Sequence, residues 1–235
     1  MGGLANSLVL GFGQLFDVAV LRIVLKSLFV TLVLFVIVAF AGWYALDWVL
    51  ASGGLGDSAF AGAEGVREAL SLLLALLGLW LTWRIVAMAV IQFFAEEVVV
   101  AVERKHYPHA ASVARDVPFA EALGNALRAA GRALLFNLLA APVALVLLFT
   151  GVGTFAVFWI VNAVLLGREL QDMVWLRHRQ GASEPAPVGG GQRFALGGAI
   201  AALLAVPFAN FLAPVLGAAS ATHLVHRTRS KGLPD

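Results

Sequence analysis

The sequence predicts an all-α integral membrane protein with two long transmembrane helices, two partially inserted helical hairpins and an N-terminal amphipathic helix. Of its 235 residues, 61% are hydrophobic and only 13% are charged, whereas a soluble domain has about 25% charged residues. Four long stretches are almost free of charge, and two of these are interrupted by proline and glycine. The absence of cysteine excludes a disulfide-stapled fold and a zinc–thiolate site.

The first elements are an interfacial helix over residues 1–22 and a transmembrane helix over residues 23–50. Apolar residues with the helical spacing of an interfacial segment are Leu8, Phe12, Leu15 and Phe16. Residues 27–46 then carry no charge, and at about 1.5 Å per residue they match the roughly 30 Å of a bilayer core. This length predicts a full crossing.

A second long helix is expected over residues 66–105. Its apolar part, residues 69–95, contains one charge, Arg84. An arginine inside the membrane indicates either a polar path or a structural ion pair with an acid on another helix. A helix shifted along the membrane normal, with Arg84 nearer the surface, is a further alternative.

The first hairpin, with its flanking helices, is expected over residues 120–177. Residues 133–167 carry no charge, but Pro142 and the Gly151-Val152-Gly153 segment should break a single helix. The expected halves have 17 and 14 residues, at or below the roughly 17–25 that a spanning helix needs. We therefore expect a hairpin that enters the membrane without crossing it.

The second hairpin is expected over residues 194–226, where Pro207 and Pro214 interrupt the apolar run. A Gly- and Pro-rich linker, residues 178–193, separates the two hairpins and is interpreted as a flexible connection without chemistry. A basic tail, residues 227–235, follows. Six full spans would also leave both termini on the same side of the membrane, so the charge distribution does not distinguish them from two spans and two hairpins. Only the short length of the apolar halves favours hairpins.

The basic residues predict the orientation. Of the 16 Lys and Arg residues, 14 lie in segments that this topology places on one face, and the opposite loop, residues 47–68, holds only Arg67. Cytoplasmic loops collect basic residues. Both termini are therefore expected in the cytoplasm.

An anion-binding site is predicted at the start of the first transmembrane helix. Arg22 and Lys26 are four residues apart and share one helix face, beside the backbone N–H groups that make a helix N-terminus attract oxyanions. The alternative is that both side chains anchor the helix to lipid phosphates.

Further charges are expected to line or gate a path through the protein. This predicted charge network consists of Arg84, Glu97, Glu103, Arg128, Arg132, Arg168 and Glu169. Mixed charge suits anion passage, because a pore of arginines alone would hold a dianion too tightly.

No metal site and no cofactor are expected. Glu103, His106 and His109 have a suggestive spacing, but Pro108 prevents one continuous helix and no fourth ligand is evident. His223 and His226 are interpreted as interfacial residues at the end of the last helix. The sequence contains no phosphate-binding glycine loop, catalytic triad motif or paired-acid site, so an enzyme is not expected.

Two segments resemble one family of membrane proteins. Residues 167–172, Gly-Arg-Glu-Leu-Gln-Asp, and the hairpin segment from Pro207 to Pro214 are similar to those of the CysZ-type sulfate permeases and the wider etoposide-induced membrane-protein family. The resemblance implies homo-oligomeric assembly and sulfate uptake across the bacterial inner membrane. It also implies that Val20, Leu21 and Arg22 match a sulfate-binding Gly-Leu-Arg motif, with Lys26 one turn further on.

The sequence therefore predicts an inner-membrane permease or channel for sulfate or a related oxyanion. The alternative is a non-transporting membrane scaffold or assembly factor, in which small residues pack against a partner and the charges are structural. A net charge of only +2 makes nucleic acid an unexpected partner.

Overall fold

The computed structural model describes the chain over residues 2–52, 64–181, 184–207 and 209–231. Within these ranges the chain is helical and contains no β-strand. The chain divides into two compact units, unit 1 with residues 1–23 and 95–235 and unit 2 with residues 24–94. Each unit is described by itself.

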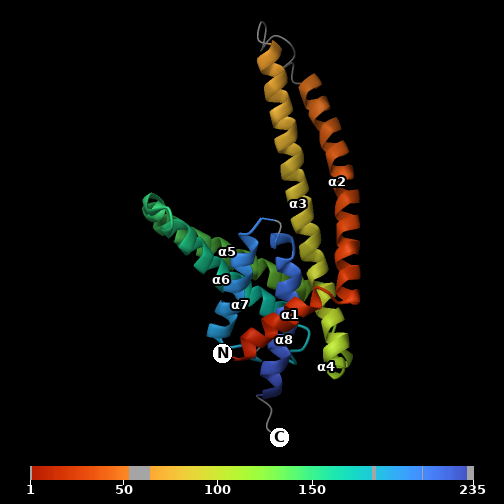
Figure 1. Ribbon diagram of the computed structural model, residues 1–235, viewed down its shortest axis with the longest axis vertical. Helices are drawn as coiled ribbons and strands as arrows, with labels where there is room; N and C mark the ends of the chain where they lie inside the picture. Colours follow the sequence, from red (N-terminus) through yellow and green to blue (C-terminus); the bar gives the residue numbers. More distant parts are fainter. Residues whose placement is uncertain (1, 53–63, 182–183, 208, 232–235) are drawn as a thin grey trace. The chain divides into compact units, whose positions relative to one another are not determined.

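Unit 2 contains most of the two longest helices, α2 (Val18–Ser52) and α3 (Glu64–His106) (Figure 1). Residues 18–42 of α2 are long and apolar enough to cross a membrane. Within the unit, Phe35 and Trp83 join the two helices edge to face, with their ring centroids 5.5 Å apart. Many apolar side chains of both helices are exposed, as lipid-facing side chains are.

Unit 1 begins with α1 (Gly2–Gln14), which packs against α8 (Ala213–Lys231). The two helices approach closely at one point, since a Cβ atom at Gly11 would lie 2.1 Å from Ser220 Oγ. The sequence prediction of one interfacial helix over residues 1–22 was wrong in its boundary: α1 ends at Gln14 and α2 begins at Val18.

The end of α3 also belongs to unit 1. The helix stops at His106, and Pro108 begins the short helix α4 (Pro108–Val113). Proline has no backbone N–H and is tolerated in the first turn of a helix but not in its interior. The predicted break at Pro108 is therefore confirmed.

The next helices form an antiparallel pair, α5 (Phe119–Val146) and α6 (Gly153–Trp175), joined through the 3₁₀ turn η2 (Leu147–Thr150). Gly151 makes the turn with φ +69°, a left-handed conformation that favours glycine. Pro142 lies inside α5, so the break in this apolar stretch falls at Gly151.

Helix α7 (Gly190–Leu204) packs against α6 at glycines. A Cβ atom at Gly197 would lie 2.0 Å from the carbonyl oxygen of Ala163, and one at Gly167 would lie 2.0 Å from the carbonyl oxygen of Arg193. The backbones of α6 and α7 can approach this closely only because glycine has no Cβ atom at these positions. Trp159 Nε1 donates a hydrogen bond of 3.0 Å to the Gly198 carbonyl at the same crossing.

The chain then turns through the 3₁₀ segment η3 (Ala209–Phe211) into α8. Most of α8 from Ala213 to His226 is buried, including Leu224 and Val225, whereas residues 227–230 are partly or fully exposed. His223 and His226 are also buried, with exposed fractions of 1% and 6%. The interpretation of these two histidines as interfacial residues was therefore wrong, because α8 packs inside unit 1.

In the described part of the chain, three helical segments are long and apolar enough to cross a membrane, judged by length and composition: Val18–Gly42, Phe119–Thr150 and Gly153–Trp175. The last two have 32 and 23 residues, so the halves of 17 and 14 residues predicted for the first hairpin were too short. The helix continues through Pro142 and both helices extend beyond the charges that bound the apolar run. In contrast, α7 and α8 have 15 and 19 residues and are not among these three segments.

Candidate functional site

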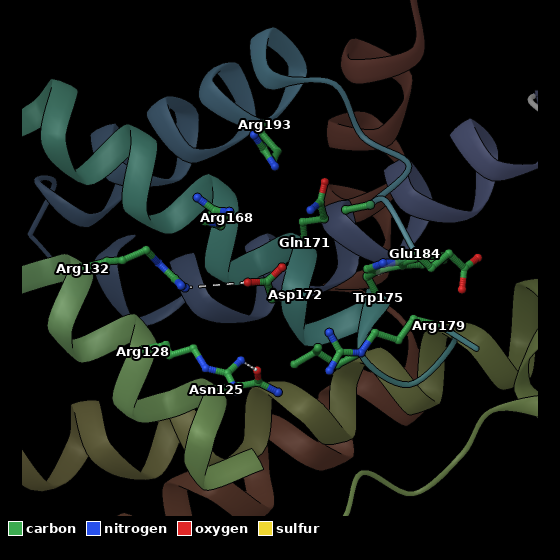
Figure 2. A pocket seen from close by; sticks show the side chains of 12 residues that line it. Asn125, Arg128, Arg132, Arg168, Gln171, Asp172, Trp175, Arg179, Glu184 and Arg193 are labelled. Atoms are coloured by element: carbon green, nitrogen blue, oxygen red, sulfur yellow. Dashed lines mark hydrogen bonds and ion pairs between the residues drawn. The ribbon is translucent and has the colours of Figure 1, made fainter. Parts of the chain in front are cut away.

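A cavity of about 310 Å³ lies in unit 1 between α5, α6, α7 and the segment joining α6 to α7 (Figure 2). Five arginine side chains line this arginine cavity: Arg128, Arg132, Arg168, Arg179 and Arg193. Its carboxylates are Asp172 and Glu184. Positive charge is therefore in excess around the cavity.

The hairpin α5–α6 brings the first of these arginines together. Arg132 is the last charge before residues 133–167, and Arg168 is the first charge after them. Because α5 and α6 are antiparallel, Arg132 in the middle of α5 and Arg168 on α6 both lie where the apolar part of the hairpin ends, away from the Gly151 turn. The arginine cavity is thus at the boundary of the apolar hairpin.

Close packing of α7 adds Arg193. The backbone carbonyl of Arg193 lies directly against Gly167, where a Cβ atom would be only 2.0 Å from the oxygen. Arg193 is in the first turn of α7, and Arg168 follows Gly167 on α6. The glycine contact therefore places the two arginines on one cavity.

Three of the five arginines have polar partners. These contacts are Arg128 Nη1 to Asn125 Oδ1 at 2.9 Å, Arg179 Nη2 to Glu121 Oε1 at 2.5 Å, and Arg132 Nη2 to Asp172 Oδ2 at 3.9 Å. The Arg132 contact is too long for a hydrogen bond. Part of the positive charge is thus balanced within the protein.

The other two arginines are the free donors of the cavity. Among the described residues, the side chains of Arg168 and Arg193 make no hydrogen bond or ion pair, and Asp172 interacts with them only through its charge. Two further N–H groups of cavity-lining residues, Asn125 Nδ2 and Trp175 Nε1, are buried without a hydrogen-bond partner. Buried donors without acceptors are costly, and an oxyanion supplies acceptors.

A second cavity of about 550 Å³ adjoins the first. The two share the lining residues Asn125, Arg132, Asp172 and Leu176. Its carboxylates are Glu96, Glu97, Asp116, Glu169 and Asp172, and its arginines are Arg115, Arg132 and Arg177. This acidic cavity therefore has the opposite charge balance from the arginine cavity.

The predicted charge network is divided among three places. Arg128, Arg132 and Arg168 line the arginine cavity, and Glu97, Glu169 and again Arg132 line the acidic cavity. Glu103 lies elsewhere, buried between two histidines. The side chain of Arg84 falls outside the described part of the chain.

The predicted anion site at the start of α2 has a different environment. Val20 is buried, with 1% exposed, whereas Leu21 is half-exposed and Arg22 and Lys26 are exposed. The Lys26 ammonium lies 4.8 Å from the ring centroid of Phe94. Whether these residues bind an anion stays a prediction.

An acid already occupies the N-terminus of α2. Asp17 Oδ1 accepts a hydrogen bond of 2.9 Å from the Ala19 N–H, and Asp17 Oδ2 pairs with Lys105. The hydrogen bond from Lys105, followed by that from Ala19, lowers the pKa of Asp17. The carboxylate thus takes the place in which a bound anion was expected to meet a free amide.

Sequence reasoning missed several lining residues of the arginine cavity: Asn125, Gln171, Trp175, Arg179, Glu184 and Arg193. Three of these fall in residues 178–193, so the segment interpreted as a flexible connection contributes side chains to the wall of the cavity. The available signal was the run of three glycines before Arg193, which begins α7 rather than continuing a loop.

The comparisons with known proteins give one result. The family model described as "Sulfate transporter CysZ/Etoposide-induced protein 2.4" matches residues 7–214. The matched range includes α2, α3, the α5–α6 hairpin and all of α7. No curated protein and no solved structure matches the chain.

Proposed function

The chain belongs to the family of the sulfate transporter CysZ and etoposide-induced protein 2.4, and from this premise we propose that it is a multi-pass membrane permease or channel for sulfate or a related oxyanion. The arginine cavity is its anion-capture site. The observation that carries the proposal is the convergence of five arginines on one cavity, two of whose side chains make no hydrogen bond or ion pair among the described residues.

The donors of the cavity suit a tetrahedral dianion. The four oxygens of sulfate accept hydrogen bonds, and each guanidinium offers two parallel N–H groups to an oxyanion. Arg168 and Arg193 supply such groups, and the unpartnered Asn125 Nδ2 and Trp175 Nε1 supply further donors. Sulfate bound by Arg168 and Arg193 would not break an ion pair, because neither side chain makes one among the described residues.

The neighbouring carboxylates support release. Transport requires binding that is favourable enough for entry and weak enough for exit. Asp172 lies on both cavities, and the acidic cavity begins directly beside the captured anion. Repulsion from its carboxylates limits the affinity of the dianion and keeps the site reversible.

The membrane arrangement follows from the hairpin. Apolar side chains around the Gly151 turn are largely exposed, with 93% for Phe149 and 73% for Val152, and lipid is the environment that suits them. With this turn inserted, Arg132 and Arg168 lie at the membrane surface. The concentration of basic residues on this side places it in the cytoplasm.

Two finer features belong to the same proposal. The chain assembles as a homo-oligomer, since the exposed apolar helices leave surface for contacts between copies as well as for lipid. Arg22 and Lys26 form a second anion contact, one turn apart on α2. The α7–α8 hairpin enters the bilayer only partially, because its helices of 15 and 19 residues are short.

The competing function is a scaffold or assembly factor without transport. In that case the arginines serve packing only, and sulfate has no effect on them. The observation that favours transport is that the Arg168 and Arg193 guanidinium groups make no hydrogen bond or ion pair with the described side chains. A purely structural arginine would be expected to make one.

Uptake of ³⁵S-sulfate into proteoliposomes tests the proposal. We expect wild-type protein to give flux above protein-free vesicles and the double variant Arg168→Gln/Arg193→Gln to reduce the initial rate at least tenfold. The control is Arg104→Gln. Arg104 is exposed and lines neither cavity, so this variant should retain the wild-type rate.

The results separate the two functions. Wild-type flux equal to that of empty vesicles, from protein that is folded by gel filtration, would reject transport in favour of the scaffold. Wild-type flux that survives in the double variant would retain transport but remove the arginine cavity from it.

A further inference from the structure

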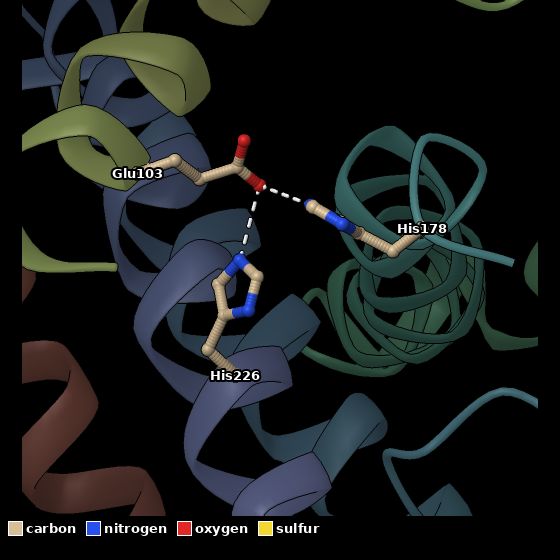
Figure 3. Close-up of side chains that lie close together, drawn as sticks. All are labelled: Glu103, His178 and His226. Carbon is tan, nitrogen blue, oxygen red and sulfur yellow. Dashed lines mark hydrogen bonds and ion pairs between the residues drawn. The ribbon is translucent and has the colours of Figure 1, made fainter. Parts of the chain in front are cut away.

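A buried cluster of one carboxylate and two imidazoles lies in unit 1, outside both cavities (Figure 3). Glu103 comes from the last turns of α3, His178 from the turn after α6, and His226 from α8. Glu103 Oε1 is 2.7 Å from His178 Nε2 and 3.0 Å from His226 Nε2. The side chains are 0%, 1% and 5% exposed, respectively.

We propose that Glu103, His178 and His226 form a structural binding site for one divalent transition-metal ion of the zinc type. The ion is independent of the anion path and joins three segments that are far apart in the sequence.

The three ligand atoms are already close to the required geometry. They all lie within 4.8 Å of one another. A tetrahedral zinc ion with ligand distances of about 2.0–2.2 Å requires separations of about 3.4 Å between ligand atoms. Side-chain shifts below about 1 Å therefore suffice, and no helix has to move.

The donor set also fits. Two imidazole nitrogens and one carboxylate are ligands that zinc takes together, with a remaining position for water or another group. Both Nε2 atoms point at one carboxylate oxygen (Figure 3). Magnesium and calcium prefer oxygen ligands alone, so the two histidines select against them.

An incompletely satisfied carboxylate is the independent sign of a ligand. Glu103 Oε2 is buried and makes no hydrogen bond, and its ion-pair contact with Arg177 is long, at 3.8 Å. Buried charge is costly unless it is well paired or coordinates a metal. Basic groups surround both oxygens of this side chain, with the two imidazoles at Oε1 and Arg177 at Oε2.

The surroundings hold the ligands in place. The ring of His226 stacks on Tyr107, with ring centroids 4.5 Å apart, and the Tyr107 hydroxyl is 2.9 Å from His223 Nδ1. Arg177 Nη1 lies 3.8 Å from Glu103 Oε2. A cation beside this oxygen is repelled by the guanidinium, so Arg177→Gln is expected to increase metal affinity.

Metal analysis of the full chain tests the site. Protein purified in detergent without a polyhistidine tag is dialysed against Zn²⁺, desalted and measured by mass spectrometry. We expect about one zinc per chain in wild type. Zinc affinity should fall more than about 100-fold in Glu103→Gln and in His178→Asn/His226→Asn, because losing ligands costs more than losing the residues that orient them. The control, His109→Asn, removes an exposed histidine on α4 and should leave one zinc bound.

Every outcome bears on the proposal. Wild type without stoichiometric zinc, or variants that retain it, would show that the cluster is only a hydrogen-bonded carboxylate. X-ray absorption of zinc-loaded wild type decides the question even where a variant does not fold. Two imidazole nitrogens at about 2.0 Å support the site, whereas a coordination shell without imidazole overturns it. Because sulfate flux is not the readout, this result is separate from that of the proposed function.

Discussion

Replacing Gly167 by alanine should both destabilise the protein and move Arg193 away from Arg168 in the arginine cavity. The added Cβ atom would lie 2.0 Å from the Arg193 carbonyl oxygen and 2.7 Å from its carbonyl carbon, where ordinary contacts are 3.4–4 Å. The α6 and α7 backbones must therefore separate by more than 1 Å at this point. No side-chain rotation relieves the contact, because both obstructing atoms are backbone.

The expected cost is at the upper end of the range for an overpacked core, about 3 kcal/mol. For a chain of this size each kcal/mol changes Tm by about 2–4 °C, so Gly167→Ala should unfold about 6–12 °C below wild type. Sulfate affinity should fall as well, since Arg193 moves away from Arg168.

The matched control is Gly131→Ala on α5, one residue before Arg132. A Cβ atom there would meet nothing within 4 Å, so alanine should stabilise the helix by about 0.5–1 kcal/mol. Thermal unfolding in detergent, followed by tryptophan fluorescence, measures both variants. A Tm for Gly167→Ala equal to that of Gly131→Ala would refute the close backbone crossing of α6 and α7.

Two further predictions concern unit 1. Gly11→Val should lower Tm, since a Cβ atom there would lie 2.1 Å from Ser220 Oγ and 2.9 Å from Ser220 N; an unchanged Tm would contradict the packing of α1 on α8. Hydrogen bonds from Lys105 and then Ala19 lower the folded-state pKa of Asp17 below its usual value of 3.8. The stability that they contribute is therefore complete above that value and is lost as the pH falls below it. Wild type should be more stable than Asp17→Asn at pH 7 and lose this advantage in acid, and a difference independent of pH would contradict the ion pair.

Much of the helical architecture could be predicted from charge and apolar length. A charged side chain is costly in the bilayer core, so charge-free stretches mark apolar helices, and Gly151 marks the turn between α5 and α6. The helix boundaries inside these stretches were harder to predict. Pro142 does not end α5, because a single proline can be accommodated within a long helix whose freed backbone groups find other partners.

The arginine cavity could be predicted only in part. Arg132 and Arg168 flank one apolar run, and an antiparallel hairpin necessarily brings such residues together. Arg193 is different, because only the backbone contact of its carbonyl with Gly167 places it beside them. That contact depends on how α7 crosses α6, which a single sequence does not encode in any local pattern.

The burial of His178 and His226 could not be predicted from local sequence either. His178 follows α6 in what reads as a linker, and His226 lies in a polar, basic segment near the C-terminus. Local composition indicates a linker for His178 and the membrane interface for His226. Tertiary packing of α8 inside unit 1 buries them against Glu103, which local sequence had grouped with His106 and His109.

The position of a bound oxyanion tests the central claim most directly. A crystal structure with selenate, located by its anomalous scattering, reports where the dianion sits. The account predicts a peak between Arg168 and Arg193 within hydrogen-bond distance of both guanidinium groups, and its loss in the Arg168→Gln/Arg193→Gln variant. Selenate at Arg22 alone, with the arginine cavity holding only water, would contradict it.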